Sequence, residues 1–396
     1  MAAEAQTLSY NAFIDSLKSH NASYRAQVLN IDISQAEIKA ARATQDPTIS
    51  IEYGNNSDWL IAMGQSASAE ISKAFAPAKA ASRIAVAQQQ LTLSQDELDD
   101  YWRQLKADAT IAYYQALLAK QVLTIDSQAY TNMAALATSD SIRFEKGEIS
   151  EVDMMQSRIE QQAALLHLNS RRTDFRNSLV ALEELCGCRV GYYRDVEGRL
   201  VLPVRLFDLQ QLIDNAMANR ADLKAASSNV DLVERQETQA IRERHPDLEL
   251  SLGASRNTRV HNEEAPAPEY MGYTLGLTLP LPVSSVNSGV RQAARLRREQ
   301  AELQKQSLST TIQSEVVRSY NDYQSSLERA QAYGKVLISE AQQVLNGKLY
   351  AYQRGDTSLL DVLVAQHTYN EMQEEYAQSL YDCMAALVEL ERAAGL

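Results

Sequence analysis

Alternating large apolar and small residues mark the stretch from Glu269 to Val283. Gly, Thr and Pro residues separate larger apolar side chains at every second position, namely Met271, Tyr273, Leu275, Leu277, Leu279 and Leu281. This alternation predicts a strand of about ten residues with one apolar and one small, weakly polar face, ended by Pro280 and Pro282. Because the surrounding sequence predicts very long helices and no second sheet, the pattern favours lipid on one side and water on the other. We therefore expect the strand to present a lipid-facing row of Tyr273, Leu275, Leu277 and Leu279.

Two segments predict helices of unusual length. From Ala78 to Arg143 the chain has neither proline nor glycine, and apolar residues recur every seven positions at Ile84, Leu91, Leu98 and Leu105. The segment from Gly289 to Tyr352 carries a similar series: Leu296, Leu303, Ile312, Val316, Tyr320, Tyr323, Leu327 and Ala330. Such seams predict coiled-coil packing, and roughly 65 residues at about 1.5 Å per residue span about 100 Å. We expect return helices over Glu151–Leu185 and Leu359–Arg392.

The chain repeats its own pattern at a long interval. A proline and a glycine bracket a short alternating run at Pro47 and Gly54 and again at Pro246 and Gly253, where 246 − 47 and 253 − 54 both equal 199. The pattern aromatic-x-x-Gly-x-x-Ser-x-x-Asp begins at Phe144 and at Tyr352, where 352 − 144 equals 208. So long a repeat predicts a duplicated half-molecule. We place the first repeat at residues 1–195 and the second at 196–396, with a mixed collar around 187–206 and the C-terminus.

Both repeats have the same predicted order of elements: a short helix, a longer helix, two strands and a helical hairpin. The helices are expected over Leu8–Ser19 and Ala22–Thr44, and over Leu206–Ala218 and Ala221–Arg244. The strands are expected over Thr48–Gly54, Ala67–Phe75, Asp247–Ser255 and Tyr270–Leu279. The hairpin tips fall near Gly147 and Gly355.

Composition excludes several classes of protein. The chain of 396 residues carries a net charge of -13, which argues against nucleic acid as a partner. The sequence has no run of about 18 apolar residues, so it predicts no transmembrane helix. No charged-then-apolar leader precedes Leu8, so we expect that an exported chain has already lost its signal peptide. Cys186, Cys188 and Cys383 make neither a disulfide framework nor a metal site. With no nucleophile elbow, phosphate loop or metal-spaced ligands, we expect neither an enzyme nor a bound cofactor.

Four strands cannot cross a bilayer alone, since the two sheet edges would leave backbone groups unpaired in hydrocarbon. Other copies of the chain must therefore close the barrel. Two copies would give a barrel of eight strands, and side chains fill the interior of so small a barrel. Three copies would give twelve strands, which leave room for a passage. The sequence thus predicts an α+β membrane protein with a transmembrane β-barrel completed by oligomerisation. Its long coiled-coil helices either wall a water-filled tube or form a slender rod.

The two half-repeats, the strand pairs, the long helices and the paired tip patterns resemble the TolC family of outer-membrane efflux proteins over essentially the whole chain. The resemblance implies a homotrimer in the outer membrane, whose long α-helical coiled-coil barrel extends into the periplasm. It also implies a periplasmic adaptor and an inner-membrane pump as partners. The run from Leu277 to Gly289 is similar to the heavy-metal efflux branch, which implies metal cations as cargo. The scattered histidines and the pair Met154-Met155 do not support that branch.

The resemblance also implies a pore gate where the tips meet. Asp361 matches an acidic position that lines the constriction, Tyr352 matches an aromatic that helps to hold it shut, and Asp153 is the equivalent acid of the first repeat. Val364 and Thr357 depart from the family pattern, so the acidic ring is expected to be thinner. For both acids the alternative is a helix-start role. The tip residues Arg143, Phe144, Lys146, Gly147, Arg354 and Gly355 are expected to contact the adaptor, or to be solvated.

Two other functions explain part of the pattern. A soluble antiparallel coiled-coil scaffold accounts for the helices but not for four symmetrically placed strands. The exit duct of a protein secretion system shares the expected fold, and the sequence does not distinguish its cargo from metals or drugs.

Overall fold

The structure is a computed structural model that describes residues 6–55, 64–260, 263–264, 266–281 and 286–396. The strands are β1 (Gln6–Leu8), β2 (Thr48–Asn55), β3 (Gln65–Phe75), β4 (Tyr193–Val196), β5 (Leu248–Asn257) and β6 (Tyr270–Thr278). The helices are α1 (Tyr10–His20), α2 (Ala22–Arg42), α3 (Pro77–Glu145), α4 (Glu151–Cys186), α5 (Leu209–Asn219), α6 (Ala221–Arg242), α7 (Val286–Ala332), α8 (Ile338–Gln353) and α9 (Leu359–Ala393). A π-helical segment, η1 (Tyr333–Leu337), joins α7 to α8.

The chain forms two compact units. The first comprises residues 1–28, 98–223 and 308–396, and the second comprises residues 29–97 and 224–307. The first unit therefore holds both helical hairpins, and the second holds the strands β2, β3, β5 and β6. Each unit draws on both halves of the sequence.

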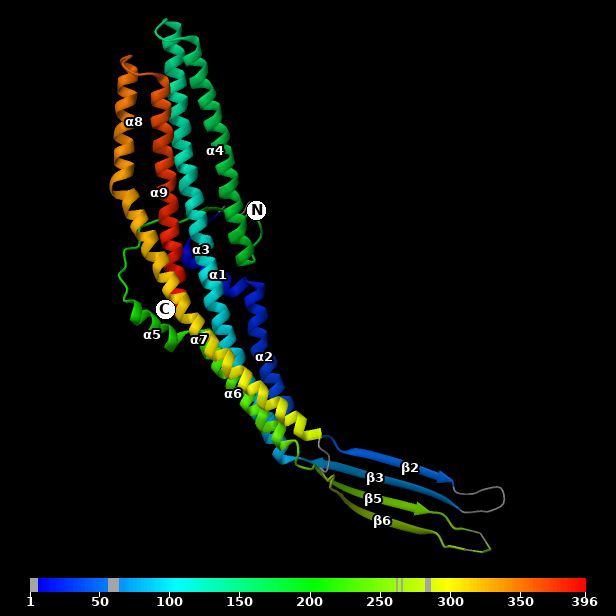
Figure 1. The fold of residues 1–396 in the computed structure, drawn as a ribbon. Coiled ribbons are helices and arrows are strands. Elements are labelled where there is room, and N and C mark those ends of the chain that lie inside the picture. Colours follow the sequence, from blue (N-terminus) through cyan, green and yellow to red (C-terminus); the bar gives the residue numbers. More distant parts are fainter. Residues whose placement is uncertain (1–5, 56–63, 261–262, 265, 282–285) are drawn as a thin grey trace. The chain divides into compact units, whose positions relative to one another are not determined.

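In the second unit the four strands form one antiparallel sheet in the order β2-β3-β5-β6, side by side in Figure 1. The β3 strand has the weakest strand pattern of the four, because Glu70 and Lys73 interrupt it. It nevertheless has 11 residues and lies inside the sheet. Its ladder to β5 pairs Ser66 with Asn257 and runs without a shift to Phe75 opposite Leu248. Backbone pairing on both sides thus maintains a strand that propensity alone does not favour.

The apolar core of the first unit surrounds one long helix. Side chains of α3 such as Tyr113 and Leu117 pack with residues of α1, α4, α5, α7 and α9. The Tyr113 hydroxyl lies 2.9 Å from the Leu8 carbonyl oxygen and 2.7 Å from that of Glu197. Leu8 is the last residue of β1, and Glu197 directly follows β4, which pairs with β1 in parallel. A buried tyrosine therefore anchors the segment around 187–206 to the helices.

The helices and strands agree closely with the sequence predictions, with four exceptions. The helix expected from Leu206 begins only at Leu209, after the N-cap Asp208, whose carboxylate accepts a hydrogen bond from the Gln211 N–H. Leu8 lies in β1 and α1 starts after the N-cap Ser9, whose hydroxyl accepts a hydrogen bond from the Ala12 N–H. Leu296 and Leu303, predicted in the seam, are exposed; Ala294 and Ala301, also seven apart, are buried instead. The fourth exception is η1, which interrupts the helix expected over Gly289–Tyr352. A Cβ on Gly334 in this segment would lie 3.0 Å from the Tyr376 ring.

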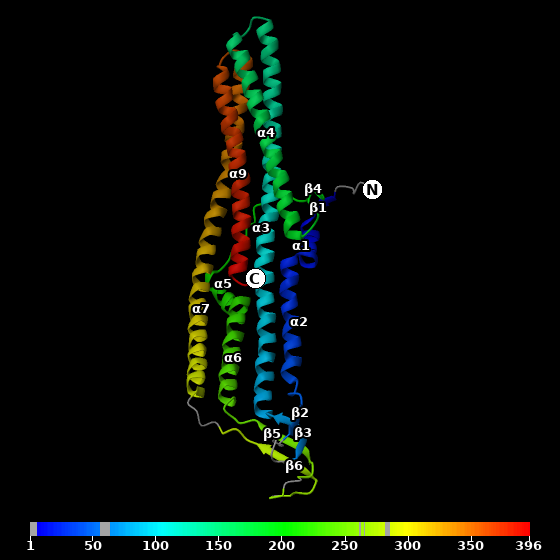
Figure 2. The ribbon, with the colours of Figure 1, turned by 90° about the vertical axis from the view of Figure 1, so that its right-hand side faces the viewer.

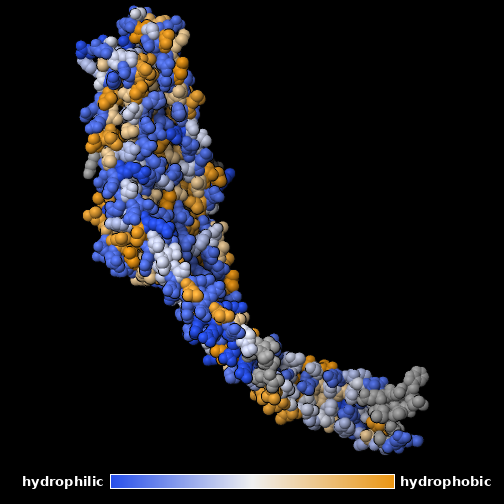
Figure 3. All heavy atoms as spheres, in the orientation of Figure 1, coloured by the Kyte–Doolittle hydropathy of each residue, from blue (hydrophilic) through white to orange (hydrophobic). Residues whose placement is uncertain are grey.

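Long polar surfaces accompany these helices. On the face seen in Figure 3, hydrophilic side chains cover most of the helical surface and hydrophobic ones form narrow patches between them. In both views the hairpins α3/α4 and α8/α9 lie together in the first unit (Figures 1 and 2).

No helix among the described residues is long and apolar enough to cross a membrane. Pro282, expected to end the last strand, lies outside the described residues.

Candidate functional site

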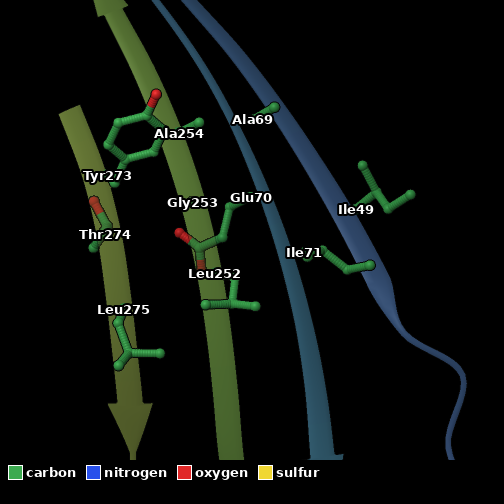
Figure 4. Close-up of a pocket in the computed structure, with 10 residues that line it drawn as sticks. All are labelled: Ile49, Ala69, Glu70, Ile71, Leu252, Gly253, Ala254, Tyr273, Thr274 and Leu275. Atoms are coloured by element: carbon green, nitrogen blue, oxygen red, sulfur yellow. The ribbon is translucent and has the colours of Figure 1, made fainter. Parts of the chain in front are cut away.

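The four-stranded sheet has two chemically distinct faces. The ladders bring register partners into rows that cross all four strands, because partners in an antiparallel pair point to the same side. One such row is Ile49, Ile71, Leu252 and Leu275, and the next contains Ala69, Ala254 and Tyr273 (Figure 4). The hollow that these rows border in Figure 4 is lined mainly by aliphatic side chains. The apolar face is highly exposed: Tyr273 keeps 81% and Leu275 72% of its accessible surface.

The opposite face, which we call the small-residue face, carries the alternate positions. It is built mostly from serine, threonine and glycine, with Glu52, Glu70 and Glu249 among them and Asn257 and Tyr270 at one end. On β6 it shows Gly272, Thr274, Gly276 and Thr278. The strand prediction from the sequence is confirmed, and Tyr273, Leu275 and Leu277 share one face. Leu279, one residue beyond β6, is also exposed.

The sheet has two open edges. Among the described strands, β2 pairs only with β3 and β6 pairs only with β5. Each edge presents a row of backbone N–H and C=O groups without a ladder partner in this sheet. An exposed apolar face combined with open edges is unstable in water, and in hydrocarbon the edges must be paired.

The two hairpin tips have matching turns. Gly147 and Gly355 adopt φ values of 76° and 79°, in the left-handed region that favours glycine. Each turn leads to a helix whose N-cap is a serine: Ser150 for α4 and Ser358 for α9. The sequence pattern therefore encodes a glycine turn followed by a capped helix.

Asp361 is bound tightly to its own turn. Its Oδ2 accepts hydrogen bonds from the Thr357 hydroxyl at 2.7 Å, the Ser358 hydroxyl at 2.8 Å and the Ser358 N–H at 3.3 Å. The Lys348 ammonium lies 3.6 Å from Oδ1. These donors, Thr357 first, lower the pKa of Asp361 to about 2. The side chain is thus ionised at every physiological pH and completes a capping box.

Asp153 holds the equivalent place at the first tip. The Ser150 hydroxyl donates to its Oδ2 at 2.8 Å, and its own N–H donates to the Ser150 hydroxyl at 3.1 Å. Both acids therefore have helix-start geometry, whatever further role they have.

A second cluster lies just behind the tips. The Tyr352 hydroxyl donates to Asp140 Oδ1 at 3.0 Å, and the Arg143 guanidinium stacks over the Tyr352 ring with its Cζ 4.8 Å from the ring centroid. Arg143 Nη1 is also 4.0 Å from Asp140 Oδ1. Asp140 is fully buried, and burial raises its pKa. Burial and the nearby Asp140 carboxylate also raise the pKa of Tyr352. The cluster, which we call the latch, ties α8 to α3.

Of the predicted gate and tip residues, the structure brings Tyr352 and Arg143 into contact. Tyr352 is buried and joined to Asp140, which the sequence analysis overlooked, and Arg143 stacks on it. The other predicted tip residues, Phe144, Lys146, Gly147, Arg354 and Gly355, are exposed. Asp140 lies in the same buried seam of α3 as Met133 and Ala137, at the next position of the helical spacing. A carboxylate at a seam position of a coiled coil was the signal that could have identified it.

No metal centre is evident in the described part of the chain, where no group of three or more His, Cys, Asp or Glu side chains is placed to hold an ion. Cys186 is buried, and burial raises its pKa to about 12, so its thiol stays protonated.

Comparison with known proteins agrees with this geometry. Residues 212–396 match the family model described as Outer membrane efflux protein. The Cobalt-zinc-cadmium resistance protein CzcC of Cupriavidus metallidurans is 26% identical over 323 residues, covering 80% of this chain and 74% of that protein. The Proteases secretion protein PrtF of Dickeya chrysanthemi is 24% identical over 325 residues, covering 75% of this chain and 66% of that protein.

A crystal structure of CusC, reported in connection with transmembrane channel formation, has the same fold with a TM-score of 0.79 at 16% identity. The superposition covers 97% of this chain and 91% of that one. The fold is therefore that of TolC-like outer-membrane channels. The chain resembles the outer membrane efflux proteins, through the family match over residues 212–396 and the similarity to CzcC. It is an outer-membrane channel of an efflux system, located in the outer membrane and extending into the periplasm.

Proposed function

We propose that three copies of this chain form the working channel. The observation that carries the proposal is the two-faced sheet with both edges open. Three copies supply 3 × 4 = 12 strands, and pairing β2 of one copy with β6 of the next satisfies every edge. The apolar face would then meet lipid and the small-residue face would line the passage.

An unpartnered stripe on α4 supports assembly of the helical part. Val152, Met155, Ile159 and Leu166 recur at intervals of three, four and seven, and each keeps between 50% and 74% of its surface exposed. Such spacing is that of a coiled-coil seam. A neighbouring copy would cover this stripe and so complete a helical barrel around the passage.

The matching tips support the division into two repeats, residues 1–195 and 196–396. Each half contains, in order, a short helix, a longer helix, two strands and a helical hairpin with the same glycine turn and serine cap. With two hairpins from each of three copies, the channel end would have six tips of nearly equal construction.

The tips form the proposed gate. Three copies of the ionised Asp361 would repel one another unless hydrated or bridged by a cation, so the ring would favour cations. The latch of Tyr352, Asp140 and Arg143 would hold each hairpin in the closed arrangement. Asp153 would add charge at the neighbouring tips, and the exposed residues around Gly147 and Gly355 would meet the periplasmic adaptor.

We infer that divalent metal cations are the cargo, delivered by an inner-membrane pump and its adaptor. The similarity to CzcC over 80% of this chain supports metal export. The similarity to PrtF, at 24% identity, supports a protein-secretion duct as the second candidate. Both functions use the same channel, so the cargo depends on the partners.

A growth experiment in the native host separates the two candidates. Cells lacking the gene should lose tolerance to cobalt, zinc or cadmium salts and regain it when the gene is restored. Unchanged metal tolerance together with loss of a secreted protease would establish the secretion function instead. A chain that forms no conductance in planar bilayers would contradict both.

A further inference from the structure

Among the described strand residues, two charged side chains lie in the register of the sheet's apolar face: Lys73 and Arg256. Arg256 is neutralised, because its Nη2 lies 2.6 Å from Glu269 Oε1 and its Nε donates to the same oxygen at 2.7 Å. Lys73 differs from it. No carboxylate among the described residues lies within 4.0 Å of its ammonium group.

The surroundings of Lys73 are apolar. Its register partner is Leu250, which in turn pairs with Leu277, so the lysine belongs to a row of leucines. Its ammonium lies over the ring of Phe75, 5.8 Å from the centroid. Phe75 is the last residue of β3 and α3 begins at Pro77. The charge is thus directed toward the end of the sheet that leads into the helices.

A lone cation on a lipid-facing surface is costly unless its long stem carries it to the polar boundary of the bilayer and an anion meets it there. The boundary at this end of the sheet is the one nearest the periplasmic helices. The anions available at that depth are the phosphates of phospholipid headgroups.

We propose that Lys73 is a binding site for the phosphate of an anionic phospholipid in the periplasmic leaflet. The inference rests on the proposed barrel, in which this face meets lipid. β3 lies between β2 and β5, away from the edges where copies would join, so assembly leaves Lys73 open to lipid. The row of Leu250 and Leu277 and the ring of Phe75 favour a lipid over free phosphate, because they provide an apolar surface for acyl chains.

The test uses the full chain purified in an uncharged detergent, first confirmed as an assembly by light scattering. The thermal unfolding midpoint is then followed while phosphatidylglycerol, phosphatidylcholine or inorganic phosphate is added. We expect phosphatidylglycerol to raise the midpoint most, and Lys73→Gln to weaken its apparent affinity about tenfold. Lys73→Arg should keep the response.

Lys39→Gln is the matched control, since Lys39 is exposed on α2, outside the sheet, and forms no ion pair within the described residues. Equal responses of Lys73→Gln and Lys39→Gln to phosphatidylglycerol would overturn the proposal. A full response to inorganic phosphate alone would show a free-anion site instead. A protein that fails to assemble in the first step contradicts the proposed channel, which is a separate result.

Discussion

At the scale of single residues, two acids at or near the tips have pKa values shifted in opposite directions. Asp361 is surrounded by donors, which hold its pKa well below the usual range, whereas burial raises the pKa of Asp140. The first carboxylate therefore provides a permanent charge. Ionising the buried Asp140 destabilises the fold, and the Tyr352 hydroxyl and the Arg143 guanidinium offset part of this free-energy cost.

Replacing Asp361 by Asn should reduce both the cation selectivity of the channel and its block by multivalent cations in planar bilayers, because the proposed trimer would lose three charges from its constriction. The control is Asp356→Asn, which removes an exposed tip charge paired with Arg354 at 3.5 Å but no capping box. If the two variants behave alike, Asp361 serves only to start α9.

Replacing Tyr352 by Phe should raise conductance by loosening the closed state. It also leaves a buried carboxylate without its donor, at a cost of about 1–3 kcal/mol in the free energy of unfolding. In a double-mutant cycle with Asp140→Asn, the two effects should be clearly less than additive. Additive effects on conductance and stability would show that the pair does not act as a latch.

The latch also predicts a pH dependence. Because the folded-state pKa of Asp140 is raised, its contribution to stability is present below the unfolded-state value of about 3.8 and is lost as pH rises through the folded-state pKa. Thermal midpoints of wild type and Asp140→Asn should therefore converge at low pH, and the wild type should fall behind as pH rises toward neutrality. A constant difference across that range would contradict this assignment.

At the scale of elements, the alternating strand and the long helices follow from periodicity, but their partners do not. The strand β3 is poor by its own sequence and is stabilised by ladders on both sides. In α7 the buried seam uses Ala294 and Ala301 rather than the nearby leucines, since small residues permit close helix approach. The segment η1 accommodates Gly334 against Tyr376, a contact with α9 that periodicity within one helix does not contain.

The register of β6 predicts a strong asymmetry between adjacent substitutions. Leu275→Arg, in the middle row of the apolar face, should destabilise the assembled protein by roughly 2–4 kcal/mol. Thr274→Arg, on the small-residue face, should be tolerated far better. The yield of assembled protein from detergent extracts measures both effects, and equal losses would show that the register is wrong.

At the scale of the whole molecule, open sheet edges and the exposed α4 stripe both require a neighbour. We expect a detergent-stable trimer with a protein mass of three times 44.1 kDa, measured by light scattering with the micelle subtracted. Leu166→Glu on the α4 stripe should weaken the trimer, and Glu160→Gln on the same helix serves as a polar control. A monodisperse, water-soluble monomer or dimer would contradict the barrel.

The sequence by itself determined the helices, the strands, the matching tips and the strand face that carries Tyr273 and Leu275, because periodicity and turn residues are local properties. Only the tertiary structure decided that β3 and β5 join the two strand pairs in one sheet, and that Tyr352 meets Asp140 across 212 positions of sequence. It also decided that Lys73 has no carboxylate partner within the described residues, whereas Arg256 pairs with Glu269. Such pairings depend on which surfaces the folded chain brings together, and no local pattern of residues contains that information.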